Sequence, residues 1–227
     1  MFQRLIANIA DIVIILPATL IYINRQYLAK ELKVLSIYVL ITFLRNLIGL
    51  IYNFLLVRYE YQANTVFYYN VHNIIGFYLI AYLYFILLKS IFWRNIILGL
   101  TAFFSFFTTL DVINGTLGIN TPEFNKYSYP ISGIFITFLA LAHLYKILKE
   151  LQTDNILTFS HFWISASFLL YFSCTFYMYL FVKNTLNVKG IDALQFWLID
   201  SIFSIIFSLL LSIVFIYSKN STVVNSK

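Results

Sequence analysis

Charged residues are scarce in this chain of 227 residues: they make up 11% of it, whereas 61% of the residues are hydrophobic and the mean hydropathy is +0.85. A water-soluble domain of this length needs more charge to cover its surface, so the composition excludes one. The seven glycines and three prolines are too few for a collagen-like, low-complexity or linker-dominated chain. What remains is a polytopic helical membrane protein.

Cysteine and the motifs of common catalytic sites are also missing. The single cysteine, Cys174, excludes a disulfide within the chain and a metal site made of cysteines alone. The sequence has no G-x-S-x-G, P-loop or H-E-x-x-H motif, and its three histidines are scattered, unlike the ligands of intramembrane zinc hydrolases. The last apolar segment has no central lysine that could hold retinal. We therefore expect no enzyme, no cofactor and no metal site.

Seven apolar segments follow one another along the chain, each long enough to cross a hydrocarbon core of about 30 Å as a helix. They cover residues 5–23, 34–57, 65–88, 91–110, 127–148, 157–182 and 193–217. The first contains Asp11 and Pro17 and lacks a small-residue cleavage site, so we interpret it as a membrane helix kinked near the proline and not as a signal peptide. We predict an all-α fold: one seven-helix transmembrane domain over residues 1–217 and a short cytoplasmic tail over residues 218–227.

Lysines and arginines between these segments indicate their orientation. Counting alternate loops places nine of them on one side of the membrane: Arg25, Lys30, Lys33, Lys89, Arg94, Lys146, Lys149, Lys219 and Lys227. Five lie on the other side: Arg4, Arg58, Lys126, Lys183 and Lys189. Because the richer side faces the cytoplasm, we expect the N-terminus outside and the C-terminus inside, in the inner (cytoplasmic) membrane of a bacterium. The net charge of +6 thus reports topology and predicts no nucleic-acid partner.

Three charged side chains lie within the predicted membrane segments: Asp11, Arg45 and Asp200. An ionisable group at membrane depth costs about 3 kcal/mol on insertion scales, so it faces protein or water and finds a partner. Two acids and one base leave one acid over, which a histidine, a bound cation or its own protonation must compensate. Further polar residues accompany these charges, namely Asn46, Asn70, His72 and Asn73.

These seven polar residues predict a pocket that is reached from outside, is built by the first, second, third and last segments, and binds a small ligand or ion. The alternative is a buried ion pair with hydrogen-bonded amides that serves packing alone, since interhelical polar contacts average about 0.6 kcal/mol each. His72 alone is either a hydrogen-bonded core histidine or a proton sensor.

A stripe of serines runs along the last segment with spacings of 3, 4 and 4 residues: Ser201, Ser204, Ser208 and Ser212. Small residues at this spacing let a neighbouring helix approach closely, so we predict a packing face. A conduit lined by hydroxyl groups is the alternative.

His143 and His161 fall near the cytoplasmic ends of the fifth and sixth segments, which a short connection makes neighbours. A two-histidine haem or metal site is one interpretation of the pair. Solvated interfacial histidines are the interpretation we favour, because no acidic or cysteine ligand accompanies them at a recognisable spacing.

The sixth segment reads H-F-W-I-S-A-S-F-L-L-Y-F-S-C-T-F over residues 161–176. With the chain length and the number of segments, it resembles a group of small seven-helix membrane proteins of Bacteroidota type that are found near two-component histidine kinases. The resemblance implies a membrane sensor or accessory subunit and designates no functional residue. From the residues themselves, Ser165, Tyr171 and Ser173 are expected to form hydrogen bonds between helices.

We therefore expect a sensor or receptor-like subunit that binds a small ligand or ion in the outer half of the membrane. The ten residues after Tyr217 are too few for an output domain, so the signal is expected to pass to a partner, such as a histidine kinase or another membrane protein. A small-solute or proton-coupled transporter that uses Asp11, Arg45 and Asp200 is the alternative, and a scaffold subunit of a membrane complex is a third.

Overall fold

The computed structural model describes residues 2–59, 66–114, 125–150, 155–187 and 193–219, and these form helices and short connections without any strand. The α-helices are α1 (Phe2–Val13), α2 (Ile15–Ile23), α3 (Lys30–Tyr59), α4 (Val66–Leu88), α5 (Ile91–Ile113), α6 (Ser128–Glu150), α7 (Ser160–Asn187) and α8 (Ala193–Ile216). Two short 3-10 helices, η1 (Arg25–Tyr27) and η2 (Ile156–Thr158), lie in the connections. Residues 220–227 of the predicted tail lie outside the described residues.

Six helical segments of the described residues are long and apolar enough to cross a membrane. They are Leu5–Ile23, Lys30–Ile51, Phe67–Leu88, Ile91–Ile113, Ser128–Glu150 and Leu198–Ile216. The prediction of an all-helical protein of membrane type is confirmed to this extent. The predicted segment 157–182 overlaps α7, which packs between α6 and α8 but is not one of these six segments.

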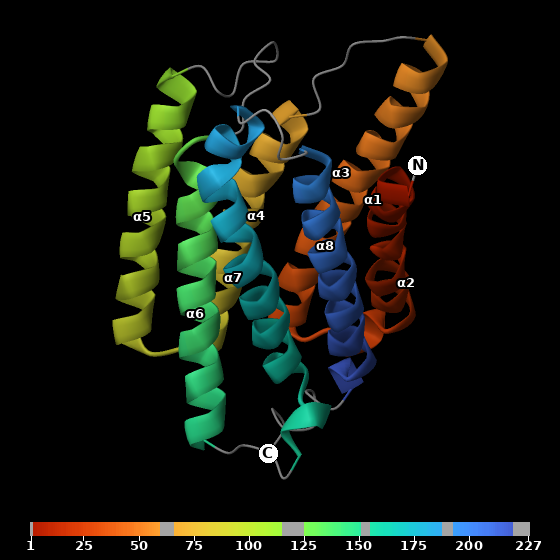
Figure 1. The fold of residues 1–227 in the computed structure, drawn as a ribbon. Helices are drawn as coiled ribbons and strands as arrows, with labels where there is room; N and C mark the ends of the chain where they lie inside the picture. Colours follow the sequence, from red (N-terminus) through yellow and green to blue (C-terminus); the bar gives the residue numbers. More distant parts are fainter. Residues whose placement is uncertain (1, 60–65, 115–124, 151–154, 188–192, 220–227) are drawn as a thin grey trace.

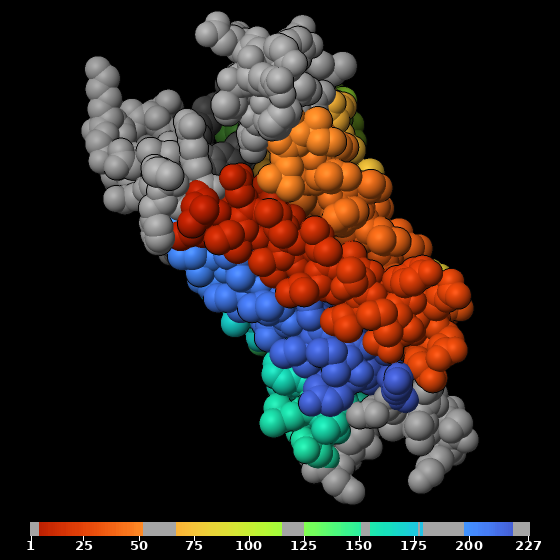
Figure 2. Space-filling model, turned by 90° about the vertical axis from the view of Figure 1, so that its right-hand side faces the viewer, coloured from red at the N-terminus to blue at the C-terminus, as the bar shows by residue number. Residues whose placement is uncertain are grey.

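The helices stand side by side in one bundle (Figure 1). We call the end where α1, α4, α6 and α8 begin the upper end, and the end where α3, α5 and α7 begin the lower end, as they lie in Figure 1. Helix α4 packs against α3, α5 and α6, whereas α7 packs against α6 and α8. Figure 2 shows α1 and α2 lying between α3 and α8 on one face of the molecule.

The first membrane segment is interrupted at Ile14, between α1 and α2. Pro17 has no N–H to donate to the carbonyl of Val13, four residues earlier, and its ring crowds that carbonyl. The helix resumes with a hydrogen bond of 3.3 Å from the N–H of Ala18 to the carbonyl of Ile14. The proline thus interrupts the helical hydrogen bonding one turn before it, at the place where the sequence predicts a kink, and Ile14 keeps a right-handed helical backbone.

The core of the bundle is aromatic and aliphatic, and large apolar side chains also cover its outside. Phe104 of α5 stacks on Phe77 of α4, with ring centroids 3.8 Å apart, and both side chains are buried. On the outside, Ile91 is 77% exposed and Phe106 is 60% exposed. Exposed apolar surface of this extent is unfavourable in water but favourable against lipid chains, as the membrane assignment requires.

Candidate functional site

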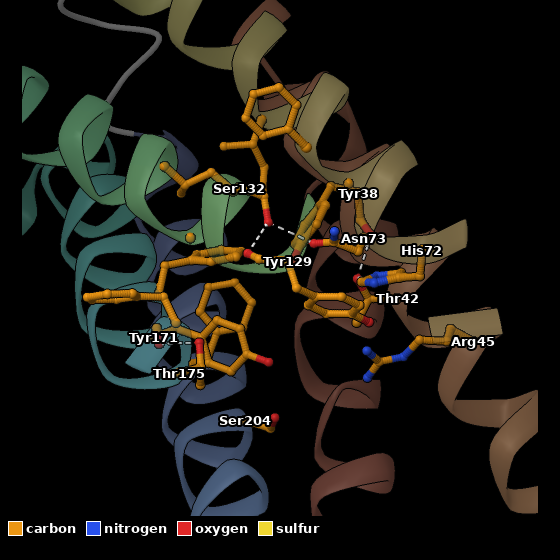
Figure 3. A pocket seen from close by; sticks show the side chains of 18 of the residues that line it. Tyr38, Thr42, Arg45, His72, Asn73, Tyr129, Ser132, Tyr171, Thr175 and Ser204 are labelled. Atoms are coloured by element: carbon orange, nitrogen blue, oxygen red, sulfur yellow. Dashed lines mark hydrogen bonds between the residues drawn. The ribbon is translucent and has the colours of Figure 1, made fainter. Parts of the chain in front are cut away.

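A cavity of about 60 Å³ lies inside the bundle, between α1, α3, α4, α6, α7 and α8 (Figure 3). A buried water needs roughly 10–15 Å³ by a comparable measure, whereas a cavity of about 150 Å³ accommodates benzene. The cavity therefore has room for several waters or for a molecule of only a few non-hydrogen atoms. Its polar lining residues are Tyr38, Thr42, Arg45, Asn46, His72, Asn73, Tyr129, Ser132, Tyr171, Thr175, Ser204 and Ser208.

Arg45 is the charged residue of the cavity lining. Its side chain extends from the middle of α3 toward the centre of the cavity (Figure 3). The guanidinium lies over the Tyr69 ring, 4.7 Å from its centroid, and Asn46 Oδ1 accepts hydrogen bonds from Nε, at 2.9 Å, and from Nη2. The neighbouring amide and ring thus fix the orientation of the guanidinium.

Asp11 of α1 and Asp200 of α8 lie close enough to Arg45 to interact with it electrostatically, although neither lines the cavity. Neither carboxylate forms a direct ion pair with the guanidinium. Asp200 Oδ1 is buried and has no hydrogen-bond partner among the described residues. The structure thus brings the three predicted charges into one electrostatic group, with an acceptor oxygen left unsatisfied beside the cavity.

Thr42 joins His72 to the backbone of α3. The Thr42 hydroxyl donates to the carbonyl of Tyr38 at 2.9 Å and lies 3.0 Å from His72 Nε2. Because a hydroxyl has only one proton to donate, the hydrogen bond between Thr42 and His72 requires a proton on Nε2. His72 is therefore a hydrogen-bonded residue of the cavity lining.

Asn73 presents an unused donor at the same wall. The Ser132 hydroxyl lies 2.9 Å from Asn73 Oδ1 and 2.8 Å from the backbone carbonyl of Tyr129, so its single proton is shared between two acceptors, and the contact with Asn73 links α4 to α6. The Nδ2 of Asn73 is buried and has no hydrogen-bond partner in the part of the chain that the structure describes. A buried N–H without an acceptor costs about 1–3 kcal/mol, so this group favours an occupant that carries an acceptor.

Asn70 lies apart from the cavity, although the sequence grouped it with His72 and Asn73. The side chain is fully buried, and its Oδ1 accepts the backbone N–H of Asn125 at 3.1 Å. Beside it, the carboxylate of Asp111 accepts the backbone N–H groups of Tyr127 and Ser128. Asn70 therefore anchors the segment that leads into α6.

Helices α6 and α7 supply a wall that the sequence-based pocket did not include. Tyr129 and Ser132 of α6, and Tyr171 and Thr175 of α7, line the cavity. Their spacings of three and four residues on otherwise apolar helices are the signal that could have identified them. The two helices lie very close together where Gly133 faces Phe176.

The serine stripe of α8 faces the inside of the bundle. Ser201, Ser208 and Ser212 are buried, and α8 packs against α1, α2 and α7. Ser204 and Ser208 also line the cavity, so the stripe combines the predicted packing face with part of the cavity wall.

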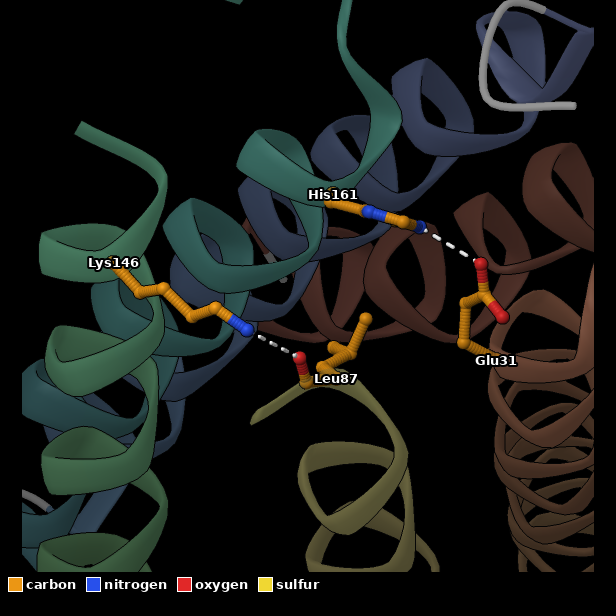
Figure 4. A network of polar contacts seen from close by, with 4 residues as sticks. All are labelled: Glu31, Leu87, Lys146 and His161. Carbon is orange, nitrogen blue, oxygen red and sulfur yellow. Dashed lines mark hydrogen bonds and ion pairs between the residues drawn. The ribbon is translucent and has the colours of Figure 1, made fainter. Parts of the chain in front are cut away.

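A second polar group lies at the lower end of the bundle (Figure 4). His161 Nε2 lies 2.9 Å from Glu31 Oε1, and Lys146 Nζ donates to the carbonyl of Leu87 at 3.3 Å. Lys146 thereby neutralises the carbonyl end of α4. Both contacts join helices that are distant in the sequence.

Both predicted histidines are hydrogen-bonded to protein groups; His143 is buried and His161 is partly buried, so the favoured interpretation of solvated histidines is wrong for His143. His143 is 3% exposed, and its Nδ1 lies 2.7 Å from the Ser165 hydroxyl. Tyr84 donates to the same hydroxyl at 3.4 Å. Within the described residues, no three histidine, cysteine or acidic side chains are grouped as metal ligands would be.

Comparison with known proteins returns no match: no family model, no curated protein and no solved structure matches this chain.

Proposed function

We propose that the chain crosses a bacterial inner membrane seven times, with its N-terminus outside. The 28 residues of α7 give a length of about 42 Å, enough to cross the hydrocarbon core beside α6 and α8. The lysine and arginine bias between loops supports the orientation. In a variant without Cys174, Lys126→Cys should react with an impermeant maleimide in intact cells, and Lys149→Cys only after permeabilisation. The opposite labelling pattern would show that the N-terminus lies inside and would contradict the proposed topology.

The function that the geometry supports best is that of a sensor or receptor-like subunit that binds a small polar ligand in the internal cavity. The observation that carries this proposal is that two hydrogen-bond donors, the Arg45 guanidinium and the unsatisfied Nδ2 of Asn73, belong to residues of the same cavity lining. Arg45 has five N–H donors, of which Asn46 Oδ1 accepts two. The ligand is therefore a small molecule with a carboxylate or carbonyl oxygen.

The cavity volume limits both the size and the affinity of this ligand. A molecule of about four non-hydrogen atoms binds no more tightly than about 1.5 kcal/mol per atom, which corresponds to a Kd of tens of micromolar at best. Acetate and acetamide, with four non-hydrogen atoms each, and methylammonium, with two, are suitable probes, because all three are this small and they differ in charge and in acceptor groups. Titrated to millimolar concentration, acetate or acetamide should stabilise the purified protein against thermal unfolding. Stabilisation by methylammonium alone would contradict an acceptor ligand.

Two glycines provide a matched pair of variants for this titration. A Cβ at Gly76, in the cavity lining, would add volume there and lie 3.2 Å from Cε2 of Tyr38, which also lines the cavity. A Cβ at Gly99, on the outside of α5, would meet no atom within 4 Å. Gly76→Ala should weaken probe binding about tenfold or more, whereas Gly99→Ala should leave it unchanged. Equal binding in both variants would exclude this cavity as the site.

Signalling requires a partner that reads the state of the cavity. Six helices line the cavity, so a bound ligand can shift their packing. The partner would detect this shift at the lower end of the bundle. The resemblance of the sixth segment favours a histidine kinase as that partner. Affinity purification from native membranes should recover a kinase or another signalling protein. If only pump subunits or metabolic enzymes are recovered, the sensor proposal is wrong and a transporter is supported instead.

One observation favours a proton-coupled carrier as a second candidate. Phe168 lies between the cavity and the hydrogen bonds of Tyr84 and His143 to Ser165: its ring centroid is 5.7 Å from that of Tyr38, in the cavity lining, and 6.3 Å from that of Tyr84. An apolar layer between two polar regions is the arrangement expected of an occluded carrier. If acetate or proton flux into liposomes occurs and is lost in Asp11→Asn and Asp200→Asn, the carrier replaces the sensor. Flux unaffected by both would exclude these residues from transport.

A further inference from the structure

A second pocket, of about 320 Å³, lies on the outside of the bundle at its lower end, away from the internal cavity. It is lined by Lys30, Tyr82, Phe85, Ile86, Lys89 and Arg94. These residues come from the start of α3, the last two turns of α4, the α4–α5 connection and the first turn of α5. Three cations from three separate elements thus meet in one pocket. A lysine or arginine whose long side chain only reaches the membrane surface needs no second cation beside it.

The three cations are exposed, and a neighbouring ring holds the charged group of Arg94. The Arg94 guanidinium lies over the Phe85 ring, 5.0 Å from its centroid. Lys89 has a φ of 46°, a left-handed conformation that turns the chain sharply between α4 and α5. Glu31 interacts with Lys89, but its Oε1 is bound to His161 inside the bundle. The pocket therefore keeps a net positive charge.

Apolar side chains border the pocket on the side that faces the membrane. Tyr82 is 46% exposed, and Ile75 and Tyr78 are exposed above it on the same face of α4. On α5, Phe92 in the first turn is 68% exposed. Going up the bundle, the surface thus changes from cationic to aromatic and then aliphatic, as a lipid does from its headgroup to its chains.

We propose that this pocket binds an anionic phospholipid. The phosphate lies among Lys30, Lys89 and Arg94, and an acyl chain follows the exposed face of α4 past Tyr82. Basic pockets between membrane helices on the cytoplasmic side bind anionic headgroups, and arginine matches the geometry of a phosphate. Charge complementarity selects this occupant over a zwitterionic lipid. Under the proposed topology, the pocket faces the cytoplasmic leaflet, where anionic lipids are attracted to basic segments.

The test is a lipid titration of the purified full-length protein in detergent, with bound lipids counted by native mass spectrometry. Phosphatidylglycerol should bind in preference to phosphatidylcholine, and added salt should weaken its binding. Lys89→Gln and Arg94→Gln should each weaken phosphatidylglycerol binding roughly fivefold, and the pair about thirtyfold. Retained binding in the pair would overturn the proposal.

The control pair is Arg25→Gln with Lys149→Gln, which removes the same charge from exposed positions at the same end of the bundle. It should change phosphatidylglycerol binding by no more than about twofold. An equal loss in the control pair would reduce the effect to overall surface charge and overturn the proposal. If the Lys89 and Arg94 pair does not fold, as judged by circular dichroism, the two single variants decide in its place.

A further arm separates a lipid from a free phosphate. Millimolar inorganic phosphate or glycerol phosphate should displace phosphatidylglycerol only weakly, because neither carries acyl chains that bind the apolar surface beside the cations. Displacement by either one as effective as that by excess phosphatidylglycerol would identify a soluble anion site and overturn the lipid proposal.

Discussion

The carboxylate of Asp111, in the last turn of α5, accepts the backbone N–H of Ser128, the first residue of α6, at 2.8 Å. The preceding N–H, of Tyr127, points at the same carboxylate. Asp111 is fully buried and thus provides the N-terminal cap of a helix that starts 17 residues later. A negative charge at this end of α6 also interacts favourably with the helix dipole.

Asp111→Ala should destabilise the protein by about 1–3 kcal/mol, because the buried N–H of Ser128 and the partly buried N–H of Tyr127 lose their acceptor. Asp111→Asn should lose less, since its amide oxygen can still accept one hydrogen bond. Reversible unfolding in mixed micelles measures both. Thr109→Ala is the control: Thr109 is exposed on the same helix, and among the described residues its hydroxyl bonds only to the carbonyl of Ser105. A cost for Thr109→Ala equal to that of Asp111→Ala would refute the capping role.

Ser165→Ala should destabilise the protein more than Ser167→Ala, although both serines are fully buried on α7. Ser165 bonds to His143 and Tyr84 on two other helices, so its loss leaves two buried polar groups unsatisfied. Ser167 bonds to the carbonyl of Ile164 in its own helix. We expect a difference of about 1–3 kcal/mol in the free energy of unfolding. Equal values for the two variants would show that the bonds to His143 and Tyr84 contribute nothing.

Gly133→Ala should destabilise the packing of α6 on α7. The added Cβ would overlap Cβ of Phe176 and lie 3.4 Å from its Cα, so the backbones must separate. Overpacking of this kind costs about 1–3 kcal/mol. Gly49→Ala is the matched variant, because no atom lies within 4 Å of its added Cβ, and it should be neutral or stabilise the helix by up to about 1 kcal/mol. Thermal unfolding of the two variants in detergent compares them, and a stabilising Gly133→Ala would contradict the close approach.

The sequence predicts helix positions and the charged group well because each depends on local or simple physical requirements. The length of apolar runs indicates the helices, and the cost of burying Asp11, Arg45 and Asp200 indicates that they meet. Asn70 could not be assigned in this way, because its partner is a backbone N–H 55 residues away. Neutral side chains such as Tyr129 carry no burial penalty large enough to mark them as cavity residues. Their role depends on how α6 and α7 rotate when they pack.

Arg45→Gln should be the most destabilising of the single substitutions in the charged group. It removes the guanidinium that interacts electrostatically with Asp11 and Asp200, together with its hydrogen bonds to Asn46 Oδ1, a loss of about 1–3 kcal/mol. Asp200→Asn should cost less, because Oδ1 of Asp200 has no hydrogen-bond partner among the described residues to lose. Reversible unfolding in mixed micelles gives the free energy for each variant.

The double variant tests whether the two charges act on each other. If Arg45 and Asp200 interact across the edge of the cavity, Asp200→Asn should recover part of the stability lost in Arg45→Gln, with a coupling energy of about 1–2 kcal/mol. The cycle of Arg45→Gln with Asp111→Asn is the control, because Asp111 caps α6 and does not belong to the charged group. Additive effects in the Arg45 and Asp200 cycle would mean that the two side chains do not interact electrostatically. The proposed ligand site would then lack a charged group that includes Asp200.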